Sequence, residues 1–366
     1  MVRDRGPFDL EQPAAPPLGD DENSPRRRPS TIIDVANEAR VAIGTVSRFL
    51  NGLPVRPGNR DQIEAAIQRL GYRRNALAAA MKSDLTNTVG FMVPTLSEFH
   101  TAVLQKLSQR MRTSGRAVLA YCHNDDRASV AEALDFFAAH RVDCLVMDGL
   151  DDAADGVREL VAGGTPVIYY DNDVTGMPVD RVLVENRAAS ARAVGHLLDI
   201  GHTRVAVLAG PAGNYTGRER LQGYLDAMQA HDIEVAPDYI VNGNWSERGG
   251  YAGILKLLSL EHPPTALFSS NYNMTIGALA LLKEHGLRVP QDISVVSFDD
   301  VPLFSLHETG ITAIAQPVDN ISETIAGLIN SRLSEEGTWH ASQTITLGCN
   351  LILRGSTRRF VAEPRK

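Results

Sequence analysis

The stretch RVAIGTVSRFLNG, residues 40–52, places one arginine, Arg48, among small and apolar residues. It holds no activated nucleophile, metal ligand or phosphate-binding loop, so catalysis is not the chemistry that it indicates. A guanidinium can bond to the edge of a guanine base or to a phosphate, and small neighbours let the backbone approach such a partner closely. The stretch therefore indicates nucleic-acid recognition by a slim helix.

Basic residues gather around this stretch. Between Arg26 and Ser83 there are ten Arg and one Lys against four acidic residues, in a chain whose formal net charge is −8. A basic segment on an acidic body predicts that this segment alone meets a polyanion. Charge by itself leaves open the alternative of a solvated surface behind a basic leader.

Three short helical patterns lie in the basic segment. Ser30 or Thr31 can cap the first, with Asp34 as the acid of a capping box. Apolar residues at i, i+3 and i+4 predict two more helices over residues 43–50 and 60–70. A tight turn between the first two predicts a helix-turn-helix, whose second helix enters the major groove of DNA. An ordinary three-helix bundle also fits this pattern.

From residue 88 onward, short apolar runs alternate with helical patterns. VGFMV, RVAVLA and ISVVSF are among the strand-like runs, and several of these runs are rich in β-branched residues. Such alternation predicts parallel sheets with crossover helices. The region is longer than one sheet usually needs, so two α/β lobes are expected.

An enzyme is disfavoured by the motifs. No GxGxxG, GxxxxGK[ST], GxSxG or HExxH is present, and His196 and His202 lack the spacing of metal ligands. No metal or cofactor is expected. Asp299 and Asp300 follow a strand-like run, where they could act as acid and base or form the rim of a ligand site.

The compartment can also be predicted. Three Cys stand far apart without a CxxC motif, and no run is long and apolar enough to span a membrane. The first residues lack the apolar core of a signal peptide. A cytoplasmic protein is therefore expected. A solute-binding receptor with the same core would need a signal peptide and would not need the basic segment.

TIIDVANEA (31–39) and TVSRFLN (45–51) resemble the DNA-binding headpiece of the lactose/galactose repressor (LacI/GalR) family. RLGYRRNALAAAMK (69–82) is similar to that family's hinge, and IGHTRVAVLAGP (200–211) and VPQDISVVSFDDVPL (289–303) follow in the family's order. The resemblance covers about residues 30–356. It implies an N-terminal all-α helix-turn-helix headpiece plus an α/β core of two parallel-sheet lobes that is similar to a periplasmic binding protein.

The expected domains follow from this resemblance. They are a basic, Pro-rich leader expected to be disordered (1–29), the headpiece (30–74), a hinge helix and linker (75–87), a first lobe (88–184 plus about 318–341), a second lobe (185–317 plus about 342–356) and a tail (357–366). The tail has no apolar heptads, so a homodimer is expected rather than a coiled-coil tetramer.

The implied function is that of a repressor of sugar-utilisation genes, which binds a pseudo-palindromic double-stranded operator and responds to a small effector. In the hinge, Met81 stands where the family inserts a Leu wedge between base steps. The alternative is that Leu77 and Met81 only pack as a pair on a linker helix. The residues expected to contact DNA are Thr31, Ile43, Gly44, Thr45, Ser47, Arg48 and Asn51 in the headpiece and Asn75, Ala78 and Met81 in the hinge.

The effector residues are carried over from the family's ligand-contacting positions, and most of them stand at strand-to-loop transitions. Carboxylates accept from hydroxyl groups, Arg and Asn donate, and an indole covers the C–H face of a sugar ring. A sugar or sugar derivative is expected, with a purine as the alternative. The assigned residues are Asp171, Arg218, Trp245, Asn271 and Asp299, with Thr95, Phe99, His100 and Val318 as weaker assignments.

Several residues depart from the family pattern, and Thr95 and Glu98 are among them because they replace the Asp and Asn common after the first core strand. Arg40 stands where Gly or Asn is usual after the first helix, and Ala42 replaces the Ser that usually caps the second. Tyr272 replaces the Asp of the usual Asn-Asp pair. The change at Tyr272 bears on the ligand rather than on the fold.

Overall fold

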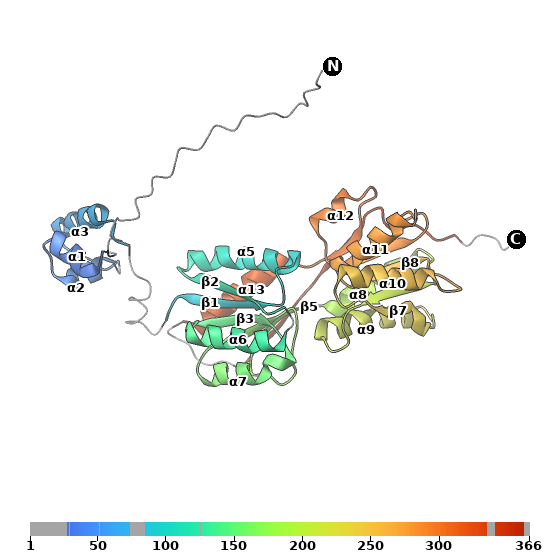
Figure 1. The fold of residues 1–366 in the computed structure, drawn as a ribbon, viewed down its shortest axis with the longest axis horizontal. Coiled ribbons are helices and arrows are strands. Elements are labelled where there is room, and N and C mark those ends of the chain that lie inside the picture. The colour runs from blue at the N-terminus through green and yellow to red at the C-terminus, as the bar shows by residue number, and fades with distance from the viewer. Residues whose placement is uncertain are drawn as a thin grey trace, which may run out of the picture. The chain divides into compact units, whose positions relative to one another are not determined.

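The computed structural model describes residues 28, 30–50, 52–73, 85–124, 126–334 and 341–361 (Figure 1). Nearly all of the leader, Asn51 and the hinge residues Asn75, Ala78 and Met81 lie outside this range. The chain divides into two compact units, Met1–Met81 and Lys82–Lys366. None of the described helices is long and apolar enough to cross a membrane.

The first unit contains α1 (Ile32–Glu38), α2 (Ile43–Leu50) and α3 (Pro57–Leu70). Thr31 and Asp34 form the predicted capping box at the start of α1. Arg40, between α1 and α2, has a φ of 53°, a left-handed conformation that costs a non-glycine residue about 1 kcal/mol.

The third helix begins one turn earlier than predicted. Residues 57–59 are Pro-Gly-Asn, which are poor helix formers, so the apolar pattern indicated a start at Arg60. Pro57 nevertheless suits the first turn, because its φ is already helical and its missing N–H would have no partner there. Val35, Val46 and Ile63, one from each helix, are fully buried at the centre of the bundle.

The second unit contains two six-stranded sheets. In the first sheet the strand order is β11-β5-β4-β3-β1-β2, and in the second it is β12-β10-β9-β8-β6-β7. All pairs are parallel except β10 with β12. The strands are β1 (Thr88–Val93), β2 (Ala117–Cys122), β3 (Cys144–Asp148), β4 (Val167–Tyr170), β5 (Asp180–Val184), β6 (Val205–Ala209), β7 (Ile240–Asn242), β8 (Ala266–Ser269), β9 (Ser294–Phe298), β10 (Thr312–Ala315), β11 (Thr344–Leu347) and β12 (Asn350–Ile352).

Helices cover both faces of each sheet, as parallel strands require (Figure 1). On the first sheet, α5 (Glu98–Thr113) and α13 (Val318–Arg332) lie on one face, and α6 (Arg127–Ala139) and α7 (Ala154–Ala162) lie on the other. On the second, α8 (Asn186–Asp199) and α9 (Tyr215–Ala230) lie opposite α10 (Glu247–Leu258) and α11 (Tyr272–Glu284). The short helix α12 (Pro302–Leu306) follows β9.

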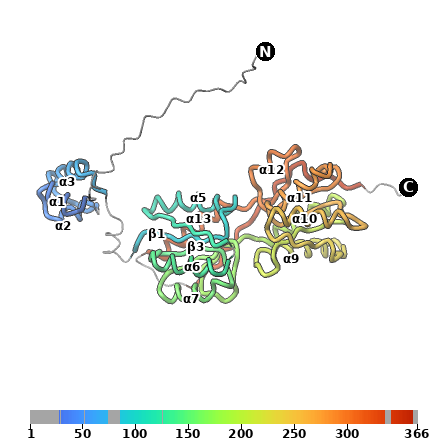
Figure 2. The backbone as a smooth tube through the Cα atoms, viewed as in Figure 1, coloured from blue at the N-terminus to red at the C-terminus, as the bar shows by residue number. Residues whose placement is uncertain are grey.

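The backbone passes between the lobes at three points (Figure 2). The first lies between β5 and α8, and the second lies between β10 and α13. The third lies between Leu347 and Asn350, because β11 pairs in parallel with β5 of the first sheet and β12 pairs with β10 of the second. The expectation that the second lobe resumes near residue 342 was therefore wrong for β11.

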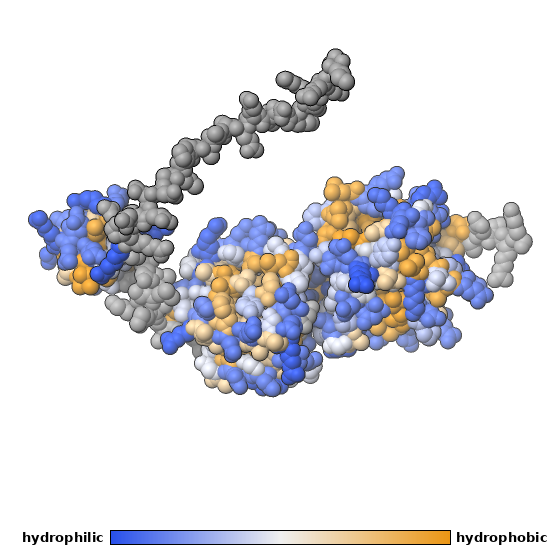
Figure 3. Space-filling view, viewed as in Figure 1, coloured by the Kyte–Doolittle hydropathy of each residue, from blue (hydrophilic) through white to orange (hydrophobic). Residues whose placement is uncertain are grey.

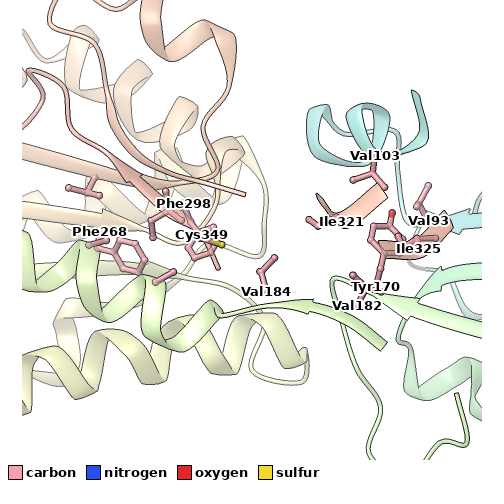
Figure 4. Close-up of a cluster of buried hydrophobic side chains, with 14 of the residues drawn as sticks. Val93, Val103, Tyr170, Val182, Val184, Phe268, Phe298, Ile321, Ile325 and Cys349 are labelled. Atoms are coloured by element: carbon pink, nitrogen blue, oxygen red, sulfur yellow. The ribbon is translucent and has the colours of Figure 1, made fainter. Parts of the chain in front are cut away.

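One buried apolar cluster extends through both lobes. It includes Val93 and Tyr170 in the first lobe and Phe268 and Phe298 in the second. Figure 4 shows Val184, at the end of β5, between these two groups of side chains. Burying a side chain of this size stabilises a fold by about 1.5–3 kcal/mol, so the first crossing segment is held by packing as well as by chain connectivity.

Helices α10 and α11 approach so closely that Gly277 has no room for a side chain, since a Cβ there would overlap the carbonyl oxygen of Glu247. We predict that Gly277→Ala lowers the free energy of unfolding by about 1–3 kcal/mol through overpacking. Gly195→Ala is the matched control, because nothing lies within 4 Å of a Cβ at that position in α8. It should stabilise by roughly 0.5–1 kcal/mol. Thermal unfolding distinguishes the two, and equal melting temperatures would contradict the packing described.

Candidate functional site

The outer face of α2 carries the residues predicted to contact DNA. Val46 is buried, whereas Ile43 is 45% exposed and Arg48 is also exposed. A Cβ on Gly44 would meet nothing within 4 Å, so the helix presents a slim surface beside Arg48. Thr45 and Ser47 are half-buried. This face can approach a groove closely.

Two predicted contact residues and several neighbouring arginines have defined surroundings. The hydroxyl of Thr31 is engaged with Asp34, to which it donates at 2.7 Å, and Arg48 donates weakly to the carbonyl of Pro54 at 3.3 Å. Arg69 pairs with Glu38. Within the described headpiece no ion pair joins Arg40, Arg48 or Arg56 to a carboxylate, so these cations remain available to phosphates.

A polar cleft of about 510 Å³ lies between the two lobes of the core. It is bordered by loops that follow the carboxyl ends of strands in both sheets, where open α/β sheets bind their ligands. The first lobe contributes Thr95, Ser97, Phe99, His100, Asp148, Asp171 and Asn172, and the second contributes Arg220, Trp245, Asn271, Tyr272, Asp299 and Gln316.

Asp171 follows β4 in a left-handed conformation with a φ of 64°. Its Oδ1 is buried and has no hydrogen-bond partner among the described residues. Burial raises the pKa of Asp171, while the nearby His100 and Arg220 act in the opposite direction. An acceptor that is buried and unpaired in a cleft is suited to a donor on a ligand.

Arg220 lies at the bottom of the cleft and is only 3% exposed. Its Nε donates to Asn186 Oδ1 at 2.8 Å, and its Nη1 donates to the carbonyl of Ser270 at 2.7 Å. The guanidinium carbon stands 3.5 Å from the centre of the Phe298 ring. Arg220 is therefore a buried cation whose position is set by hydrogen bonds and by an aromatic face.

Asp299 lies beside this cation. Its Oδ2 is 3.9 Å from Arg220 Nη1, and its Oδ1 accepts from Gln316 Nε2 at 2.7 Å. Like Asp171 it has a left-handed backbone, with a φ of 70°. Its neighbour Asp300 instead makes a bidentate pair with Arg354 away from the cleft.

Trp245 is half-buried at the cleft and comes from the loop between β7 and α10. Its ring fills the space beside Gly210, where a Cβ would overlap the indole. Asn271 Nδ2 donates to the Trp245 carbonyl at 3.2 Å, and Asn271 Oδ1 caps α11 by accepting from Met274 N. Asn271 therefore positions the tryptophan loop in addition to lining the cleft.

Two of the assigned residues do not line the cleft. Arg218 donates to the carbonyl of Gly213 at 2.9 Å on the exposed surface of α9, and Val318 packs against the apolar cluster at the start of α13. Residues two positions apart on a helix point in nearly opposite directions. The structure therefore places Arg220 at the cleft instead of Arg218.

Several lining residues were missed by the sequence reasoning. Arg220 shares the buried face of α9 with Thr216 and Tyr224 at helical spacing, and this period would have indicated it. Asp148 ends β3, with its Oδ1 3.5 Å from His123 Nε2, and Gln316 follows β10. Nothing in local sequence marks these two, because their convergence depends on strand order.

A helix-turn-helix unit and a two-lobed α/β core with a polar cleft define the class of ligand-binding transcriptional regulators. The model of bacterial regulatory proteins of the lacI family matches residues 31–75, and that of the periplasmic binding protein-like domain matches residues 194–357. The chain therefore joins a helix-turn-helix domain of the lacI type to a periplasmic binding protein-like domain.

The chain is 29% identical to the HTH-type transcriptional repressor CytR of Escherichia coli (strain K12), over 90% of this chain and 96% of that protein. It is 28% identical to catabolite control protein A of Priestia megaterium, over 90% of this chain and 99% of that protein. Among solved structures, the Lac repressor dimer bound to operator and the anti-inducer ONPF matches with a TM-score of 0.80 and 26% identity, covering 90% of this chain and 100% of that chain. A CelR–cellobiose complex matches with a TM-score of 0.68 and 28% identity, covering 89% of this chain and 99% of that chain.

Because burial raises the pKa of Asp171, we predict that its charged carboxylate lowers the stability of the folded protein in a pH-dependent way. When burial raises the pKa of an acid in the folded state, its charge costs stability above that pKa, and the cost disappears as pH falls through it. Asp171→Asn should therefore raise the melting temperature at about pH 8 and lose this advantage toward about pH 4.

Asp155→Asn is the control for loss of one negative charge, since the side chain of Asp155 is 96% exposed. A constant difference in melting temperature between Asp171→Asn and wild type across this pH range would contradict the burial of the Asp171 carboxylate.

Proposed function

We propose that this protein is a repressor that binds a pseudo-palindromic operator as a homodimer and changes its DNA affinity when a small polyhydroxy effector enters the cleft. The observation that carries the proposal is the joining of a basic helix-turn-helix unit to a cleft with an unpaired, buried carboxylate oxygen. The similarity to CytR and to the operator-bound Lac repressor supports the DNA-binding part. Because the operator lies on the chromosome, the proposed place of action is the cytoplasm.

The DNA contact that we propose uses α2 as the recognition helix. Arg48 would reach a guanine edge or a phosphate, and Ile43 would contact a thymine methyl. Gly44 would read no base and would serve close approach. Residues of the hinge, including Asn75, Ala78 and Met81, remain proposed minor-groove contacts because they lie outside the described residues.

The effector class is inferred from the chemistry of the cleft. Asp171 and Asp299 supply acceptors for hydroxyl groups, Arg220 supplies a cation, and Trp245 supplies an aromatic face. Because Asp148, Asp171 and Asp299 outnumber the cations, an anionic ligand is disfavoured. The similarity to a regulator solved with cellobiose supports a sugar. We propose that the cleft binds this ligand and does not catalyse a reaction.

In the proposed dimer, an apolar surface of the core would contact the second copy of the chain. A groove between α11 and α12 is lined by Ile276, Leu279, Phe304 and other apolar residues. Leu303 is 52% exposed and Leu306 is 79% exposed beside it, and apolar residues gather on this face in the space-filling view (Figure 3). Exposed apolar patches of this kind mark protein interfaces, and the similar Lac repressor structure is a dimer.

For the DNA-binding part, we predict that Arg48→Ala weakens binding to the operator by about 1–3 kcal/mol if the contact to a base is bidentate. Arg69→Ala is the control, since Arg69 lies on α3 and pairs with Glu38 of α1. Fluorescence anisotropy with the promoter duplex should show two chains per duplex and an affinity that falls steeply with salt. Equal affinities for the promoter duplex and a random duplex would refute this part of the proposal.

For the effector part, we predict that a ligand found by thermal shift with sugars, sugar acids and purines binds Asp299→Asn roughly tenfold or more weakly, because a charge-assisted hydrogen bond is lost. Asn is the same size as Asp and also tolerates a left-handed backbone. Arg218→Ala should bind that ligand as wild type does, since Arg218 does not line the cleft. Calorimetry measures both. A ligand that is indifferent to Asp299→Asn would not occupy this cleft.

A further inference from the structure

Two hydrogen-bonded contacts join the lobes on either side of the cleft. At the first, Thr216 N donates to Asn172 Oδ1 at 3.1 Å, and Thr216 Oγ1 donates to the carbonyl of Asp171 at 2.8 Å. At the second, the backbone N–H of Glu98 donates to the hydroxyl of Tyr272 at 3.2 Å. Glu98 belongs to the first lobe and Tyr272 to the second, and Tyr272 also lines the cleft.

Tyr272 is held by the second lobe, and its hydroxyl reaches the first lobe. It is the first residue of α11, directly after the Asn271 cap. Its ring packs against the small apolar cluster of Val301 and Phe304. Burial raises the pKa of Tyr272, so the phenol stays neutral at physiological pH.

Glu98 provides a donor that its own helix cannot use. It is the first residue of α5, and Ser97 is the cap. The N–H groups in the first turn of a helix have no acceptor within the helix, and Ser97 accepts from His100 instead of from Glu98. The Tyr272 oxygen therefore satisfies an N–H that would otherwise face water.

The two contacts differ in burial. Thr216 and Asn172 are 3% and 6% exposed, so water has little access to their hydrogen bonds. The Glu98–Tyr272 bond lies at the exposed surface of the cleft and is single, so water can replace it at small cost. The side of the cleft that opens most readily is therefore the Tyr272 side.

We propose that the Tyr272 hydroxyl is a latch at the mouth of the effector cleft, and that its bond to the Glu98 N–H sets the balance between a closed and an open core. The role of the latch rests on the proposed function, because it matters only if an effector enters this cleft. Tyr272 is a positioning residue in this scheme. Its ring bounds the mouth of the cleft, and its hydroxyl holds the N-terminus of α5 against the second lobe.

The first test uses quenching of Trp245 fluorescence by acrylamide, in a Trp339→Phe background that leaves Trp245 as the one tryptophan of the chain. Tyr272→Phe keeps the ring and removes the latch. We expect the quenching constant without effector to rise, with a roughly two- to tenfold larger open population, the range that one net hydrogen bond supports.

Tyr251→Phe is the matched control for the first test. It removes a hydroxyl that bonds to Glu284 within the second lobe, so quenching should not change. An equal quenching constant in Tyr272→Phe and its parent would overturn the proposal.

The second test removes the donor. Proline is favoured at the first position of a helix, so Glu98→Pro should preserve α5 and lose the N–H, while Glu98→Ala keeps it. Glu98→Pro should match Tyr272→Phe in quenching, and the double variant should be no more open than either single variant. Additive effects would mean that the two groups act independently and would overturn the latch.

If Glu98→Pro perturbs the helix, hydrogen exchange at the Glu98 amide tests the bond to the Tyr272 hydroxyl without that variant. The amide should exchange faster in Tyr272→Phe than in wild type, and unchanged exchange would contradict the bond. None of these measurements needs effector or DNA. A negative result for the Tyr272–Glu98 bond would therefore not contradict the proposed function. If no effector is found, the bond can still be measured.

Discussion

The buried guanidinium of Arg220 is the interaction on which the arrangement of the cleft depends. A cation with 3% exposure is tolerated only where hydrogen bonds and compensating charge replace water. The start of α8 provides Asn186, the end of β8 provides the Ser270 carbonyl, and the end of β9 provides Phe298 and Asp299. Satisfying one charge thus fixes the relative positions of three elements at the floor of the site.

The backbone around the cleft is also constrained. Asp171, Trp245 and Asp299 all adopt positive φ values, which are uncommon for residues with a Cβ and persist only where the surroundings hold them. Each stands where the chain turns sharply after a strand. The parallel sheets bring these turns to a common edge, and the strained conformations direct the side chains or loops to the cleft. The fold thereby prepares the site before any ligand binds.

Local patterns predicted the parts of the fold that local forces determine. The helix α2 has the bounds that its apolar spacing indicated, and the Thr31–Asp34 capping box is present. Strands buried on both faces, such as β6 and β9, read as continuous apolar runs. By contrast, β7, β11 and β12 are short and partly exposed strands at or near sheet edges. They lack such runs, and only the pairing of distant segments defines them.

The candidate site could be predicted in part for the same reason. Aligning family motifs brought Asp171, Trp245, Asn271 and Asp299 to attention, and the structure places all four at the cleft. The alignment of motifs did not distinguish Arg218 from Arg220, because that choice depends on which face of α9 is buried. The role of Tyr272 was also not evident, since its partner is a backbone N–H far away in the sequence.

The three crossings between the lobes have a consequence for how such a chain can be rebuilt by recombination. Each lobe is assembled from segments separated in the sequence, with β11 returning to the first sheet and β12 to the second. If two related genes recombined once within the core, at least one sheet of the product would therefore combine strands from both parent proteins. The headpiece, in contrast, is one continuous segment ahead of the core. New DNA specificities can be acquired by one splice, whereas new cleft chemistry must arise by substitutions within the existing lobes.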